Sequence, residues 1–169
     1  MKFIDNRQMI NPKILKWSED IIQQFQWAKE KYNRLILFVA PSGSGKSETL
    51  FNINKKIQSP IINVNLELTR LMLDITKRQR VLQFSRLFNE IINIKTDEIV
   101  MLDNIEILFD PIFKTEPLQL LKQCSRNKTL IISWNGTVEN NRLIYAIPSH
   151  PEYRSYPLGD LIVIGLTEN

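Results

Sequence analysis

Residues 35–47 read LILFVAPSGSGKS, and this stretch decides the fold. The run at 35–39 is short and wholly apolar and is followed closely by a proline, which predicts a strand buried on both faces, as in a parallel sheet. Residues 46–58 after it have helical character. Two of the five glycines, Gly43 and Gly45, lie between them, which points to a loop with an unusual backbone. We therefore predict a strand, a glycine-rich loop and a helix in direct succession.

The rest of the chain alternates helices with buried apolar strands, which predicts an α/β fold with right-handed crossovers. Helices are expected at 14–32, 46–58, 68–92 (as one helix or two) and 118–125, and strands at 35–39, 61–64, 99–102, 130–134 and 161–166. Ser18, Glu19 and Asp20 look like a cap, so the first helix is expected to start at Ser18 or just before it. The stretch 136–160 is rich in turn residues and is predicted to be a loop.

Length and composition limit the number of domains and the class of protein. The chain has 169 residues and 19.9 kDa, enough for one domain over 1–169, with 1–33 as a helical segment packed on it. With 43% hydrophobic and 24% charged residues it is neither disordered nor membrane-spanning, and its N-terminus has no apolar signal region. One cysteine and one histidine exclude an internal disulfide and a zinc cluster, which favours the cytoplasm. The net charge of +4 is compatible with a polyanion such as DNA and equally with a solvated basic surface.

Residues 40–47, APSGSGKS, fit the Walker A pattern with alanine in place of its first glycine. Two glycines let successive backbone N–H groups turn inward around phosphate oxygens, and the following helix points its positive N-terminus at the same oxygens. Lys46 would reach the β- and γ-phosphates, and Ser47 would give a hydroxyl to Mg²⁺. The fold is therefore expected to be a P-loop NTPase three-layer sandwich. The expected ATP-binding residues are Pro41, Ser42, Gly43, Ser44, Gly45, Lys46, Ser47 and Glu48.

Asp103 ends a predicted strand at the side where α/β sheets bind ligands. A P-loop needs a carboxylate for its Mg²⁺, so Ser47 and Asp103 are the predicted metal ligands, although a cap after a strand is the alternative for Asp103. Related ATPases often place a glutamate next, but Asn104 stands here and cannot take a proton from water. Glu106 is the first candidate for the general base and Glu67 the second; each is otherwise a solvated acid.

Asn135 ends the fourth predicted strand. If that strand lies between the Walker A strand and the strand of Asp103, Asn135 faces the γ-phosphate and orients the attacking water; otherwise it is a turn residue. Lys46, Glu106 and Asn135 are therefore the predicted catalytic residues.

An arginine from a neighbouring subunit would complete the charge stabilisation. Arg142 and Arg154, in the predicted loop before the last strand, are the candidates, and each alone is otherwise a surface arginine. His150 and Tyr153 lie in the same stretch, for which a packed loop is the better interpretation.

Four segments together resemble one family: APSGSGKS (40–47), IVMLDNIEILF (99–109), IISWNG (131–136) and LIYAIPSHPEYRSY (143–156). They resemble the BrxF family, the small P-loop proteins of type 3 BREX bacteriophage-defence systems, over roughly 15–166. The resemblance implies an ATP-binding domain of the AAA+ or a related kind, acting in the bacterial cytoplasm beside other defence proteins. It matches Lys46, Ser47 and Asp103 to the nucleotide and Mg²⁺ positions. Full AAA+ modules carry a helical lid after the last strand, and no such C-terminal lid is expected here.

The predicted function is that of a Mg·ATP-binding protein with slow or partner-stimulated ATPase activity in bacteriophage defence. The alternative is a nucleotide-gated binding or scaffold module for DNA or a defence partner, with little hydrolysis, which Asn104 favours. A small-molecule kinase is a further rival, although no arginine-rich lid segment is visible. Other defence proteins, DNA and a second copy of the chain stay open as partners, and a membrane is not expected.

Overall fold

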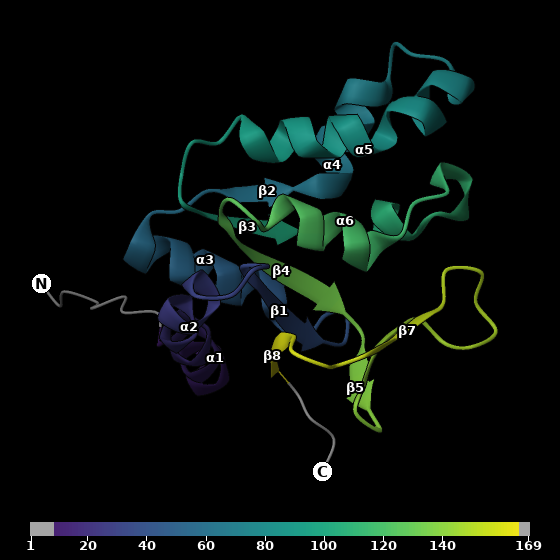
Figure 1. The fold of residues 1–169 in the computed structure, drawn as a ribbon. Helices are drawn as coiled ribbons and strands as arrows, with labels where there is room; N and C mark the ends of the chain where they lie inside the picture. Colours follow the sequence, from purple (N-terminus) through teal and green to yellow (C-terminus); the bar gives the residue numbers. More distant parts are fainter. Residues whose placement is uncertain (1–8, 166–169) are drawn as a thin grey trace, which may run out of the picture.

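The computed structural model describes residues 9–165 and has a five-stranded, all-parallel sheet at its centre (Figure 1). The strand order is β2-β3-β4-β1-β8. The strands are β1 (Leu35–Ala40), β2 (Ile61–Asn63), β3 (Ile99–Asp103), β4 (Thr129–Asn135) and β8 (Ile162–Gly165). The predicted α/β class and five-stranded sheet are confirmed, and the sheet is parallel throughout. The final position expected in the last strand, Leu166, lies outside the described residues.

Helices cover both faces of this sheet, which gives three layers (Figure 1). One face packs against α1 (Pro12–Gln23), α2 (Phe25–Lys29) and α3 (Lys46–Ile57), and the other against α4 (Val64–Met72), α5 (Lys77–Asn93) and α6 (Pro117–Cys124). Two short 3₁₀ helices, η1 (Glu106–Phe109) and η2 (Pro111–Phe113), follow β3. Side chains of β1 alternate between the two cores: Ile36 and Phe38 point to one and Leu37 to the other. Full burial of each contributes about 1.5–3 kcal/mol, which explains the continuous apolar run.

The first helix starts earlier than predicted. Asn11 caps it by accepting a hydrogen bond from Lys13 N at 2.9 Å, with a proline at the first helical position. Ser18 is instead a buried interior residue, which donates to Ile14 O at 2.7 Å and accepts from Asn52 Nδ2 at 2.9 Å. The start predicted at Ser18 is therefore wrong, because its hydroxyl serves a tertiary contact rather than a cap. Of the two options left open for 68–92, the structure shows two helices, with a capping box at Thr76 starting the second.

The stretch 136–160 is not a simple loop. It contains a three-stranded antiparallel sheet of β5 (Thr137–Glu139), β6 (Arg142–Tyr145) and β7 (Arg154–Pro157). Asn140 and Asn141, both at positive φ, make the two-residue turn between β5 and β6. Trp134 anchors this sheet to β4, since its Nε1 donates to Ile144 O at 3.1 Å and its ring lies edge-on to Phe109. No helix within 9–165 is long and apolar enough to cross a membrane.

Candidate functional site

A cavity of about 350 Å³ lies at the carboxyl end of the parallel strands, beside the glycine loop that joins β1 to α3. Gly43 and Gly45 have φ of +76° and +106°, a region that other residues rarely adopt, so the loop requires glycine at both positions. Gly45 is the residue before α3, so the first turn of that helix opens onto the cavity. The lining residues are Ser42, Gly43, Gly45, Lys46, Ser47, Glu48, Asp103, Asn104, Glu106, Ser133 and Asn135.

Lys46 is the cation of this cavity, and only 5% of its surface is exposed. Its Nζ donates to Ala40 O at 2.8 Å and to Pro41 O at 2.7 Å, so the ammonium is folded back onto the loop. Burial lowers the pKa of Lys46, while the negative charges of Asp103 and Glu106 act in the opposite direction. The cation and two carboxylates therefore share one electrostatic environment.

Asp103 stands at the end of β3, one strand removed from β1, and is 9% exposed. Its Oδ1 accepts from Asn104 N at 3.0 Å, and Asn104 itself has φ of +51°. Asparagine tolerates this left-handed conformation, which turns the chain sharply at the strand end. Ser47, exposed in the first turn of α3, lines the same cavity as Asp103.

Two amides from different parts of the fold hold Glu106. Asn135 Nδ2 donates to its Oε1 at 2.5 Å, and Asn65 Nδ2 donates to its Oε2 at 3.0 Å. The condition for Asn135 is met, because β4 lies between β1 and β3. Glu106 and Asn135 therefore meet at the cavity, and their catalytic roles stay predictions.

Asn65 is the residue that the sequence reasoning missed. Besides bonding Glu106, its Oδ1 accepts from Ile107 N at 2.8 Å, and its backbone N donates to Asn104 O at 2.9 Å. It thus fixes the whole turn from Asn104 to Ile107. The only available signal was a polar residue close after the end of β2, at the same sheet edge as Asp103.

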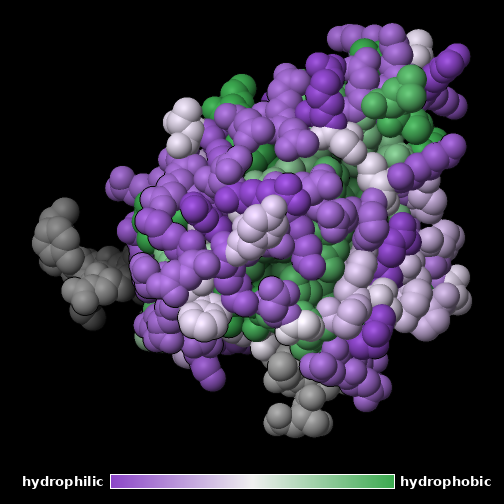
Figure 2. All heavy atoms as spheres, viewed as in Figure 1, coloured by the Kyte–Doolittle hydropathy of each residue, from purple (hydrophilic) through white to green (hydrophobic). Residues whose placement is uncertain are grey.

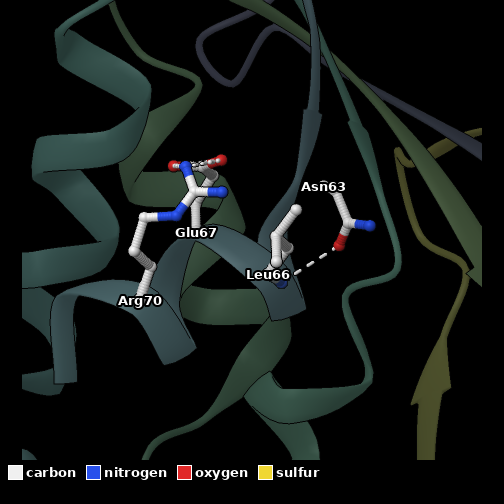
Figure 3. A network of polar contacts seen from close by, with 4 residues as sticks. All are labelled: Asn63, Leu66, Glu67 and Arg70. Atoms are coloured by element: carbon white, nitrogen blue, oxygen red, sulfur yellow. Dashed lines mark hydrogen bonds and ion pairs between the residues drawn. The ribbon is translucent and has the colours of Figure 1, made fainter. Parts of the chain in front are cut away.

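Glu67, the second candidate base, is turned away from the cavity. It pairs with Arg70 one helical turn later at 3.2 Å, while Asn63 caps α4 by accepting from Leu66 N at 3.1 Å (Figure 3). Glu67 lines a separate hollow beside β2, together with residues of α5 such as Ile91.

Four other predicted residues, Pro41, Ser44, Arg142 and Arg154, are not part of the cavity lining. Pro41 and Ser44 shape the loop, since Ser44 N and Oγ both donate to Pro41 O, at 3.3 and 2.6 Å. Arg142 on β6 binds Ser155 across the small sheet, and Arg154 donates to Tyr153 O. Neither arginine lines the cavity in this chain.

The described residues contain no group of three or more His, Cys, Asp or Glu side chains suited to a metal. A cation here would be held by the Asp103 carboxylate and the Ser47 hydroxyl together with ligand oxygens and water, which is the way Mg²⁺ usually binds. No protein-family model, curated protein or solved structure matches this chain.

Proposed function

We propose that the protein binds Mg·ATP in the glycine-loop cavity and hydrolyses it slowly, or faster when a partner stimulates it. One observation carries the proposal: Lys46 and Ser47 at the start of α3 line the same cavity as Asp103 and Glu106. A loop with two glycines at positive φ, followed at once by a helix N-terminus, suits a phosphate chain. An ammonium and two carboxylates then suit a phosphate–metal pair better than an apolar ligand.

The donor set fits both parts of the ligand. Lys46 would exchange the carbonyls of Ala40 and Pro41 for phosphate oxygens, and both carbonyls keep other donors, from Gly136 N and from Ser44. Ser47 and Asp103 would hold Mg²⁺, which neutralises charge on the phosphates when bound. We also propose that the glycine loop beside this cavity is a P-loop.

For hydrolysis, Glu106 is the carboxylate that would accept a proton from water. Each of its oxygens already accepts one amide hydrogen bond and keeps a further lone pair, so it can still receive a water. Asn135 would orient that water, and Asn65 would fix the position of Glu106.

The alternative is a nucleotide-gated binding module with little turnover. Asn104, directly after Asp103, has no basic form at neutral pH, and the carboxylate of Glu106 is engaged by two amides. Both features favour slow chemistry. The resemblance to the BrxF family supports a role for either version in bacteriophage defence, beside other defence proteins.

A direct titration with a fluorescent ATP analogue and Mg²⁺ tests the proposal. Lys46→Ala should weaken binding at least about tenfold, because it removes a charge-assisted contact to phosphate. Lys55→Ala is the matched control: Lys55 lies on the same helix, with its ammonium 5.2 Å from the Phe51 ring centre, outside the glycine-loop cavity. Equal affinity of wild type and Lys46→Ala would refute the proposal.

Turnover separates the two versions of the function. The isolated protein should hydrolyse ATP on the order of once per minute or less, well below typical enzymes. A rate that climbs with protein concentration would indicate an arginine supplied in trans, with Arg142 and Arg154 the first to substitute. Undetectable turnover with intact binding would favour the binding module.

A further inference from the structure

A second surface, at the opposite end of the sheet from the glycine loop, combines exposed aromatic rings with cations. Trp27 is 59% exposed and Tyr32 is 73% exposed, although both ring types are usually at least half buried. Each has a cation over it: Lys31 Nζ lies 5.7 Å from the Trp27 ring centre, and Arg126 Cζ lies 5.1 Å from that of Tyr32. Two aromatic rings are thus exposed to solvent, each beside a cation, and they lie five positions apart in the chain.

The two pairs belong to one continuous surface. The turn before β1 is joined to the turn before β4, because Arg34 N donates to Ser125 O and Leu130 N to Arg34 O, both at 2.8 Å. Lys31 and Lys122 of α6 also line one small hollow, together with Asp160. We call this the aromatic–basic surface: Trp27, Lys31, Tyr32, Arg34, Lys122 and Arg126. It lies where β1 and β4 begin, whereas the glycine-loop cavity lies where they end.

Its charge is positive on balance. Besides the four cations of the surface, two acids are placed beside it by their contacts: Glu98, which meets Lys29 close to Trp27 in the chain, and Asp160, which lines the hollow of Lys31 and Lys122. Lys29 is paired with Glu98 at 2.8 Å, which neutralises that acid. Lys31 binds Asp160 through its backbone carbonyl and not through its carboxylate. The side of the molecule over α1, α2 and α3 is predominantly hydrophilic, whereas hydrophobic areas show in the middle of this face and near the α4–α5 turn (Figure 2).

We propose that the aromatic–basic surface binds single-stranded nucleic acid, with bases stacking on Trp27 and Tyr32 and phosphates contacting Lys31, Lys122 and Arg126. Stacking on exposed rings needs unpaired bases, because a duplex keeps its base faces covered. Cations interleaved with the rings supply the backbone attraction, and each arginine or lysine can move from its ring to a phosphate. A protein partner with an apolar face fits less well, since the rings here are isolated among charges.

Fluorescence anisotropy with labelled oligothymidylate and oligouridylate of about 20 nucleotides measures the binding, and a duplex of equal length is the comparison. Both single strands should bind at low salt, and the ratio of their affinities tells whether DNA or RNA is preferred. Trp27 gives an internal probe, because the chain has three tryptophans and the other two, Trp17 and Trp134, are 6% and 0% exposed. Stacking should therefore quench the exposed Trp27 when a strand binds.

The variants separate stacking from charge. Trp27→Ala and Tyr32→Ala should each weaken binding at least about fivefold, while Trp27→Phe should keep most of the affinity and lose the quenching. Arg126→Gln should lower the slope of log affinity against log salt by about 0.7, the loss of one phosphate contact to a single strand. Phe51→Ala is the matched control, because Phe51 is also 57% exposed under a lysine but lies on α3, outside this surface. It should bind like the wild type.

Three results would overturn the proposal: no saturable binding of either single strand at low salt, a duplex bound as tightly as the strands, or binding that leaves the Trp27 emission unchanged. The titrations contain no nucleoside triphosphate. Their failure would therefore leave the proposed Mg·ATP site untouched, and a failed ATP titration would leave this surface untouched.

Discussion

Replacing Asn65 tests how the candidate site is built. Asn65→Ala removes two side-chain hydrogen bonds, the one donated to Glu106 Oε2 and the one accepted from Ile107 N. The backbone hydrogen bond from Asn65 N to Asn104 O stays, so the turn loses its side-chain support but not its path. Asn65→Asp keeps an acceptor for Ile107 N and places a second carboxylate beside Glu106.

The magnitude follows from these two contacts. A hydrogen bond to a charged group contributes about 1.5–3 kcal/mol and an ordinary one about 0.5–1.5 kcal/mol. Because Asn65 and Glu106 are partly exposed, water replaces part of these hydrogen-bond energies. We therefore expect Asn65→Ala to lower the free energy of unfolding by about 1–3 kcal/mol. For a chain of this size that lowers Tm by about 2–12 °C. Asn65→Asp should lose more stability at neutral pH than at acidic pH, where protonation relieves the repulsion between the two carboxyl groups.

Thermal unfolding of the three proteins at two pH values measures the structural part, and steady-state ATP turnover measures the functional part. If Asn65 positions Glu106, Asn65→Ala should lower kcat and leave KM for ATP nearly unchanged. An unchanged Tm would show that the two hydrogen bonds contribute nothing to stability. A raised KM at constant kcat would show that Asn65 acts in nucleotide binding instead.

Four further changes probe the same region. Asp103→Ala should make nucleotide binding insensitive to Mg²⁺ in titrations with and without a chelator; a retained Mg²⁺ dependence would assign the ion to another acid. Glu106→Gln should lower turnover, by up to about 10²–10⁴-fold for a general base, with ATP affinity nearly intact, and a fast rate that survives it would contradict the assignment. Because burial lowers the pKa of Lys46 below its ordinary 10.5, the free energy of unfolding should rise as pH increases from that lowered pKa toward 10.5, and Lys46→Met should abolish the rise. Gly136→Ala would place a Cβ 1.9 Å from Ile144 O. Chemical denaturation should therefore show that the free energy of unfolding falls by more than the roughly 0.5–3 kcal/mol of ordinary substitutions.

The central sheet could be predicted because its strands are buried on both faces. Every residue of β1 is buried, and such a run has no other interpretation between a helix and a glycine loop. The small sheet at 137–157 was missed because its strands have three or four residues and only partial burial. Its stability comes from Trp134 and from the stacked rings of Phe109 and Tyr145, whose centres are 3.5 Å apart. The contact between Phe109 and Tyr145 joins residues 36 positions apart, and no local sequence pattern reveals it.

The site shows the same division between local and long-range information. That Lys46 and Asp103 line the cavity could be predicted from their places at the glycine loop and at the end of a strand. Asn65 and Glu67 lie two and four positions after the end of β2, and two positions along a helix turn the side chain by about 200°. Asn65 consequently faces the turn after β3, and Glu67 faces away toward Arg70. Choosing between them required the phase of α4, which depends on where Asn63 caps it.

Asn104 matters more through its backbone than through its missing carboxylate. Its left-handed conformation turns the chain after Asp103, and Glu106, two residues later, then reaches Asn135 at the end of β4. The cavity thus has a carboxylate in spite of the asparagine that follows the strand. Under the proposed function, there are two ways for that carboxylate to accept a proton. It does so either with both amide hydrogen bonds in place or after one of them has been exchanged for a water. If exchange is needed, a partner that draws Asn65 away would raise the rate without contributing any catalytic group of its own, and Asn65→Ala would then raise kcat in the isolated protein instead of lowering it. Stimulation by such a partner should then be lost in Asn65→Ala and retained when Arg142 and Arg154 are substituted, whereas an arginine supplied in trans by a second copy predicts the reverse.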